Sequence, residues 1–357
     1  MNLTRRDWLA GSAVTVAALP FLETSSALAS EAPSALPLRL VHPDLRALMP
    51  MIAKFGAMSP PLSRATLAEA RKPNPVFNQP PMAAPAWERR LIPVGRPHPD
   101  VAIYVVNAKP GTSRPAILHT HGGGYIIGSA ESSVRQLQEL CAKLDCVAVS
   151  VDYRLAPETT YAGSIEDNYA GLKWLHAHAA ELGADPAKIA IMGESAGGGH
   201  AALLAITARD RGEVPVCFQC LIYPMLDDRT GTSRSVKPWV GTIIWDAKKN
   251  RLGWECFLGM VPGGKRSPVA GVPSRNPNLA GLPPAFIAVG TLDLFCDEDV
   301  DYAQRLNNAG VPAEIIVVPG AFHGFDGIAK MANVPLGTWF ENTKLNALRR
   351  GFGIAAI

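Results

Sequence analysis

Short apolar segments alternate with longer amphipathic ones over most of the chain from residue 88 onward. The pattern predicts strands at 88–94, 101–106, 116–121, 147–151, 189–192, 218–222, 286–289 and 315–318, and helices at 132–144, 165–182, 196–211 and 298–309. Short buried strands separated by helices are typical of a mostly parallel sheet covered by helices on both faces. The fold class predicted for this chain is therefore α/β.

Two segments depart from this alternation. Residues 30–87 are rich in proline and contain helical patterns at 44–55 and 62–71, and residues 228–268 carry Trp239, Trp245 and Trp254 without a strand pattern. Three tryptophans so close together are unfavourable to leave in water, which argues against an ordinary surface excursion. We expect both segments to form a helical cap over the sheet's C-terminal edge, with 88–227 and 269–357 as the two parts of the core.

The first 29 residues have the features of a targeting segment. Arg5-Arg6 precedes an apolar run over 10–22, and Ala27-Leu28-Ala29 has the small-x-small pattern of a cleavage site. This combination resembles the bacterial twin-arginine signal, which exports folded proteins across the inner membrane. A membrane span would need about 20 apolar residues, and Glu23 ends the run too early. Cleavage is expected after Ala29, with the mature protein in the periplasm.

The composition favours a globular protein that acts on a small molecule. Of the 357 residues, 48% are hydrophobic and 18% are charged, and the formal net charge is +3. Lys and Arg form no cluster beyond short pairs, which argues against a nucleic-acid partner. Beyond residue 29 no apolar run is long enough for a stable membrane anchor. The sequence leaves the oligomeric state open, a homodimer included.

One serine lies in the context that a catalytic nucleophile requires. Gly193-Glu194-Ser195-Ala196-Gly197 follows a predicted strand and opens a predicted helix, which is the setting of a G-x-S-x-G turn. Small residues at 193 and 197 permit the sharp turn, and the helix N-terminus favours negative charge that develops near the serine. The sequence therefore predicts Ser195 as a nucleophile.

A serine nucleophile needs a base and an acid that orients the base. His323 lies in a loop beyond the last predicted strand, and Asp293 follows the strand before it. The order serine, acid, histidine is the one expected in this kind of sheet. Asp297 is the rival acid, but it starts the next helix, where an Asp is usually an N-cap. We predict a triad of Ser195, Asp293 and His323.

A glycine-rich turn follows the predicted strand at 116–121. In His121-Gly122-Gly123-Gly124 the missing side chains let backbone N–H groups approach a ligand closely. We predict that the amides of Gly123, Gly124 and Ala196 form an oxyanion hole. A phosphate loop is disfavoured because no G-x-G-x-x-G or G-K-[ST] pattern is present. His119 and His121 lack a nearby third metal ligand, so neither a metal nor a cofactor is predicted.

These motifs together resemble those of the hormone-sensitive-lipase-like carboxylesterases, bacterial family IV of the α/β-hydrolase superfamily. The resemblance extends from about residue 88 to residue 327. Five blocks carry it: His121 to Gly124, Asp152-Tyr153-Arg154-Leu155-Ala156-Pro157-Glu158, Gly193 to Gly197, Tyr223-Pro224-Met225-Leu226-Asp227, and Leu282-Pro283-Pro284 through Asp293 to His323-Gly324-Phe325. Two departures are visible, Glu194 where Asp is commoner and Thr159-Thr160-Tyr161 in place of His-Pro-Phe.

The resemblance implies an α/β-hydrolase fold with a two-piece cap and serine chemistry on short-chain acyl esters, without a cofactor. It also supports Gly123 and Gly124 as oxyanion donors. Deacetylation of an amide or a sugar would use the same triad and stays open as an alternative. A binding module is the contrasting class, because relatives such as plant gibberellin receptors keep the fold but lose the catalytic histidine. His323 is present here, which favours an enzyme.

Overall fold

A computed structural model describes residues 36–58, 61–72 and 79–355, which belong to one compact unit that begins at Ala35. The predicted export signal and its cleavage site lie outside these residues. None of the helices in the described ranges is long and apolar enough to cross a membrane. The division into cap and core segments stays a prediction.

A single eight-stranded sheet organises the fold, in the order β1-β2-β4-β3-β5-β6-β7-β8. β1 pairs with β2 and β2 with β4 in antiparallel fashion, and every later pair is parallel. The strands are β1 (Trp87–Ile92), β2 (Val101–Val106), β3 (Arg114–Thr120), β4 (Val147–Val151), β5 (Ala184–Glu194), β6 (Phe218–Ile222), β7 (Ala285–Gly290) and β8 (Ala313–Val318). The predicted α/β class with a mostly parallel sheet is confirmed.

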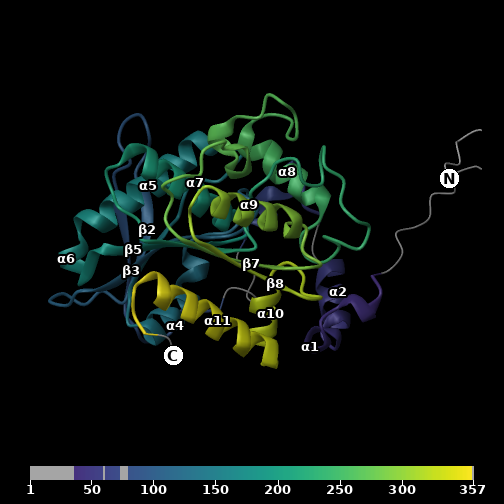
Figure 1. Cartoon of the computed structure of the whole chain (residues 1–357), viewed down its shortest axis with the longest axis horizontal. Helices are drawn as coiled ribbons and strands as arrows, with labels where there is room; N and C mark the ends of the chain where they lie inside the picture. Colours follow the sequence, from purple (N-terminus) through teal and green to yellow (C-terminus); the bar gives the residue numbers. More distant parts are fainter. Residues whose placement is uncertain (1–35, 59–60, 73–78, 356–357) are drawn as a thin grey trace, which may run out of the picture. The chain divides into compact units, whose positions relative to one another are not determined.

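Helices cover both faces of the sheet, as Figure 1 shows. Buried side chains of α4, α10 and α11 form one core cluster with the sheet, and those of α5, α6, α7 and α9 form another on the opposite face. The helices are α1 (Pro43–Arg46), α2 (Met49–Met58), α3 (Leu67–Ala70), α4 (Val134–Leu144), α5 (Tyr161–Ala177), α6 (Ala179–Leu182), α7 (Ala196–Arg211), α8 (Ala247–Leu258), α9 (Cys296–Asn308), α10 (Phe325–Met331) and α11 (Pro335–Gly351).

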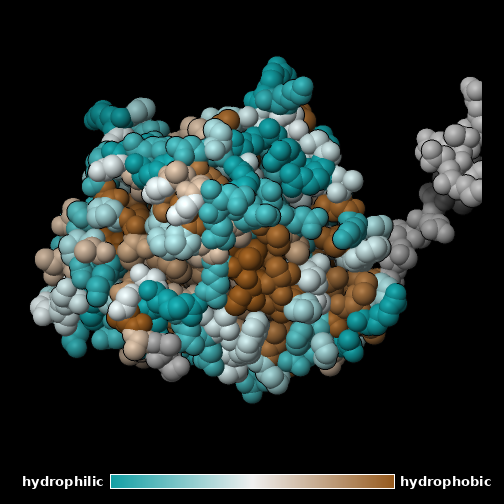
Figure 2. Space-filling view, viewed as in Figure 1, coloured by the Kyte–Doolittle hydropathy of each residue, from teal (hydrophilic) through white to brown (hydrophobic). Residues whose placement is uncertain are grey.

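The central strands are buried on both sides, which explains their continuous apolar sequences. Every residue of β4 and of β7 is buried, whereas β8, the last strand of the sheet, has half-buried residues at Ile315, Ile316 and Val317. On the face seen in Figure 2, apolar side chains gather in one patch around the position at which β7 and β8 are labelled in Figure 1. The carboxyl ends of the parallel strands meet at one edge, and the loops that leave this edge carry the site.

Candidate active site

The turn between β5 and α7 holds Ser195 in a strained conformation. Its φ is 58° and its ψ −123°, a left-handed region that residues with a Cβ rarely adopt. The flanking glycines are required by close approach of the chain: a Cβ on Gly193 would lie 2.4 Å from the carbonyl of Gly197, and one on Gly197 would lie 2.0 Å from the carbonyl oxygen of Thr120. The sharp turn lifts the Ser195 hydroxyl above the end of the sheet.

Three side chains from three loops meet above this edge. The Ser195 Oγ lies 2.9 Å from the Nε2 of His323, and the Nδ1 of His323 lies 2.8 Å from the Oδ2 of Asp293. A carboxylate only accepts, so Nδ1 carries the hydrogen and Nε2 is free to accept the Ser195 proton. All three side chains are buried. The structure brings together the three residues predicted to form the triad.

Asp293 is buried and held by the backbone, whereas the rival acid Asp297 is exposed. The second carboxylate oxygen of Asp293 accepts the main-chain amide of Phe295 at 3.0 Å. Asp297 is exposed in the first turn of α9, and no hydrogen bond joins it to His323 within the described ranges. α9 begins at Cys296, so Asp297 is not the N-cap that the sequence suggested but lies one residue inside the helix.

The glycine-rich turn after β3 passes beside the nucleophile. A Cβ on Gly122 would lie 3.6 Å from the Cβ of Ser195. Gly123 and Gly124 have φ values of 124° and 59°, which only glycine adopts without strain. In the described part of the chain, the amides of Gly123, Gly124 and Ala196 have no acceptor. Three free N–H groups near the Ser195 hydroxyl suit a developing oxyanion.

The other histidines near the site are buried in the interior of the protein. His119 joins Ser150 at 2.8 Å and Glu194 at 3.0 Å, so the longer side chain of Glu194, compared with Asp, reaches a partner in β3. Burial lowers the pKa of His121 to about 4 and that of His200 to about 3, which keeps both neutral. The H-x-H pair is therefore used internally. Among the residues described, no cluster of metal-ligating side chains is present.

The loop after β6 contacts all of the segments that carry the triad. The amide of Met225 donates to the carbonyl of Ser195 at 2.9 Å, and the Tyr125 hydroxyl donates to the carbonyl of Met225 at 2.8 Å. The Tyr223 hydroxyl donates to Asp326, three residues beyond His323, at 2.6 Å. Tyr223 also packs its ring edge-on against the His323 ring. The sequence shows this block only as part of the family resemblance and predicts no role for it.

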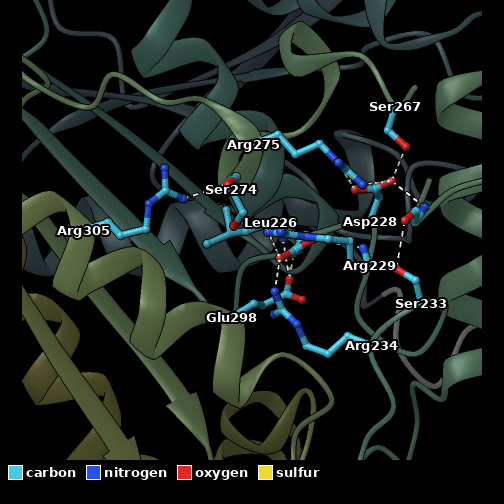
Figure 3. Close-up of polar contacts among 12 residues, drawn as sticks. Leu226, Asp228, Arg229, Ser233, Arg234, Ser267, Ser274, Arg275, Glu298 and Arg305 are labelled. Carbon is cyan, nitrogen blue, oxygen red and sulfur yellow. Dashed lines mark hydrogen bonds and ion pairs between the residues drawn. The ribbon is translucent and has the colours of Figure 1, made fainter. Parts of the chain in front are cut away.

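Buried carboxylates fix the far end of the same loop (Figure 3). Glu298 of α9 accepts the amides of Leu226 and Asp227 at 2.6 Å and 3.1 Å. Asp228 accepts Arg275, the hydroxyl of Ser267 and the amide of Gly263. Because Gly263 and Ser267 lie at the end of the 228–268 segment and Asp228 at its start, this carboxylate joins the two ends of that segment.

Two acids in this region have raised pKa values. Burial, with the nearby Asp227 carboxylate, raises the pKa of Glu298 well above its ordinary value, and burial beside Glu298 and Asp293 does the same for Asp299. The Oε2 of Glu298 and both carboxyl oxygens of Asp299 lack a hydrogen-bond partner among the residues described. Asp227 differs because Arg229 and Arg234 bind it, and these contacts outweigh burial and lower its pKa.

Comparison with known proteins places this chain in a family. A family model described as alpha/beta hydrolase fold matches residues 117–327. The chain is 38% identical to Esterase LipI of Mycobacterium tuberculosis over 236 residues, covering 66% of this chain and 72% of that protein. It therefore belongs to the hormone-sensitive-lipase-like branch of the α/β hydrolases.

Two further relatives support this family assignment. Carboxylesterase NlhH of M. tuberculosis is 36% identical over 244 residues, which cover 66% of this chain and 73% of that protein. The solved structure titled Bacterial Heroin Esterase superposes with a TM-score of 0.77 at 35% identity, covering 88% of this chain and 99% of the other. At the level of the family, the chain is a carboxylic ester hydrolase of the serine esterase class.

Proposed function

We propose that this hydrolase cleaves short-chain carboxylic esters through an acyl-enzyme on Ser195. The observation that carries the proposal is the unbroken hydrogen-bonded series from Ser195 Oγ through His323 to Asp293, at 2.9 Å and 2.8 Å. A serine hydroxyl is a weak nucleophile without such a base. The three free amides beside it supply the complementary half of the chemistry, because they can bind the charge that attack creates.

In the first half of the reaction, the Ser195 Oγ forms a bond to the ester carbonyl carbon while its proton passes to Nε2 of His323. The carbonyl oxygen becomes an oxyanion that accepts hydrogen bonds from Gly123, Gly124 and Ala196. Asp293 stabilises the charged imidazole without taking its proton. When the tetrahedral intermediate collapses, the bond to the alcohol oxygen breaks, and His323 returns the proton to the departing alcohol.

In the second half, water enters the place of the alcohol. His323 removes a proton from this water as the water oxygen attacks the acyl carbonyl carbon. The oxyanion forms again and accepts hydrogen bonds from the same amides. Collapse breaks the bond to Ser195 Oγ, and His323 gives the proton back to the serine. The products are the carboxylic acid and the free enzyme, so no cofactor enters the balance.

Kinetics of a nucleophile variant test the proposal. Ser195→Ala should remain folded and lose about four to six orders of magnitude in kcat toward p-nitrophenyl acetate, because only residual binding and oxyanion stabilisation would remain. Ser150→Ala is a matched control, since Ser150 is also buried and also hydrogen-bonded to a histidine. A Ser195→Ala enzyme that keeps more than about a tenth of the wild-type rate would refute the proposal.

We infer that the protein reaches its place of action by twin-arginine export, with cleavage after Ala29 and a mature form in the periplasm. Support comes from Arg5-Arg6, the apolar run over 10–22 and Ala27-Leu28-Ala29. Replacing both arginines by lysine should retain the full-length precursor in the cytoplasm, and the wild-type mature N-terminus should be Ser30. Mature protein in the periplasm of the double variant would rule out this route.

A further inference from the structure

We propose that Trp245 is the residue that sets the length of the acyl group this hydrolase accepts. The proposal rests on the esterase function above and adds to it a specificity-determining side chain. The 228–268 segment offers three tryptophans that could form such a wall, meaning a side chain that limits the length of the acyl pocket. Trp254 is fully buried beneath Tyr125 and Phe257, and Trp239 is 44% exposed, so neither borders the nucleophile. Trp245 alone among them contacts the site.

The indole of Trp245 lies directly on the oxyanion turn. Its CH2 atom is 2.1 Å from the position a Cβ of Gly124 would occupy, so the ring touches the Gly124 main chain. Its ring centre is 6.4 Å from that of His323, and the side chain is almost fully buried. The ring therefore extends from the amides proposed to hold the oxyanion toward the proposed base, over the place where a substrate carbonyl must lie.

The backbone that presents this indole is strained. Ile244 has a φ of 65°, and the Trp245 amide donates to the carbonyl of Ile243 at 2.8 Å, which closes a three-residue γ-turn. A β-branched residue at positive φ is a genuine outlier, so this conformation is strained. The Ile244 side chain is 42% exposed, so its own packing does not compensate for this strain. The turn instead fixes the direction of the next residue, Trp245.

Contacts at the other end of the indole fix its tilt. The Nε1 of Trp245 donates to the Oδ1 of Asn250 at 3.2 Å, and the Nδ2 of Asn250 donates to the carbonyl of Thr230 at 2.8 Å. Asn250 is fully buried in α8. Thr230 lies two residues after Asp228. The contacts of Asp228 with Arg275, Ser267 and Gly263 join the two ends of the 228–268 segment (Figure 3). The wall is thus anchored to the core rather than free to swing.

The chemistry of ester cleavage assigns this wall to the acyl side. The alcohol oxygen must point at His323, because it receives the proton from Nε2. Tyr223 and Phe295 pack edge-on around the His323 ring, with ring centres at 4.8 Å and 5.3 Å, and border that side. The acyl chain leaves the same carbon in another direction. Trp245, which touches Gly124 but lies farther from His323, borders the acyl chain.

The test compares acyl profiles of variants of the full chain. kcat/KM is measured for p-nitrophenyl acetate, butyrate, hexanoate, octanoate and laurate, and the octanoate-to-acetate ratio is taken as the readout. Trp245→Ala should raise this ratio about tenfold, because each methylene admitted to an apolar pocket improves binding. Trp245→Phe should raise it less. Trp239→Ala, a tryptophan change in the same segment away from the nucleophile, should leave it unchanged.

A second series separates this inference from the function on which it rests. Acetate esters of alcohols of increasing size keep the acyl group constant, and Trp245→Ala should alter that profile by less than about twofold. An unchanged octanoate-to-acetate ratio in Trp245→Ala, or a shift seen only in the alcohol series, would overturn the inference while leaving the esterase function intact. A wild-type enzyme inactive on every ester would instead remove the proposed function itself.

Discussion

The amide of Leu226 donates a 2.6 Å hydrogen bond to the Oε1 of Glu298, and this bond joins two segments that serve the site. Glu298 lies in α9, which begins three residues after Asp293, and Leu226 follows Met225, whose amide holds the carbonyl of Ser195. One buried carboxyl group therefore connects the loop of the acid to the loop that braces the nucleophile. Glu298 accepts through one oxygen only, which leaves the other without a role in hydrogen bonding.

The raised pKa of Glu298 predicts a pH-dependent stability. Burial raises its pKa well above the ordinary 4.5, so the folded protein keeps a proton that the unfolded chain releases above that pH. The contribution of Glu298 to the free energy of unfolding is fully present below about pH 4.5, and it decreases as the pH rises toward the pKa of Glu298 in the folded protein. Glu298→Gln keeps the acceptor and does not titrate. Its unfolding free energy in urea, relative to wild type, should increase from pH 5 to pH 8; a constant or decreasing difference would contradict this.

Removing the Tyr223 hydroxyl should weaken the positioning of the base. Tyr223→Phe keeps the ring against His323 but loses the bond to Asp326, so the loop that carries His323 becomes less well fixed. We expect kcat to fall about tenfold or more with KM little changed, because displacement by a fraction of an ångström affects the chemical step. Thr343→Val, which also removes one hydroxyl but at a half-buried position of α11, should leave kcat unchanged. A fall in both variants, or in neither, would argue against this role.

The two candidate acids predict unequal effects. Asp293→Asn should lower kcat by about four orders of magnitude, because an amide facing Nδ1 favours the wrong tautomer of His323. Asp297→Asn, an equivalent change four residues away on an exposed turn, should stay within about twofold of wild type. Steady-state kinetics with p-nitrophenyl acetate distinguish them, and comparable losses would mean that Asp293 does not orient the base.

Close packing at the nucleophile turn predicts a sharp intolerance of one glycine. A Cβ at Gly197 would be 2.0 Å from the carbonyl oxygen of Thr120, so Gly197→Ala should lower the unfolding free energy by about 2 kcal/mol or more. Gly327 lies in α10 with nothing within 4 Å of its would-be Cβ, so Gly327→Ala should be neutral or stabilising by up to about 1 kcal/mol. Denaturant unfolding of both variants tests the pair, and equal effects would contradict the packing argument.

Local signals in the sequence predicted the elements that they directly govern. α7 spans Ala196–Arg211 as predicted, because a glycine-flanked turn starts it and Gly212, at a φ of 65°, ends it. β2, β4 and β6 also have the predicted bounds, since each apolar run coincides with the paired segment. β5 was predicted too short: it begins at Ala184, where residues less buried than those of its centre still belong to the strand.

Features that depend on contacts between distant residues leave no local signal in the sequence. The sequence predicted a helical cap for 228–268 but gave no bounds for its helix, which is α8; this helix buries Trp254 and Phe257 among aromatic rings from other segments. The contact of Trp245 with Gly124 joins residues far apart in the chain and leaves no periodic pattern. The same holds for Glu298 and Leu226. Sequence patterns predict which residue types the site needs, and tertiary packing determines which neighbours position them.

Covalent labelling of the full-length protein tests the central claim most directly. A p-nitrophenyl phosphonate forms a stable bond to an activated serine, and intact mass followed by peptide mapping identifies the modified residue. The account predicts one phosphonate per chain, attached to Ser195, with the label absent from Ser195→Ala and strongly slowed in a His323→Ala variant. Labelling at any other serine, or a label that persists in Ser195→Ala, would contradict the assignment of Ser195 as the nucleophile.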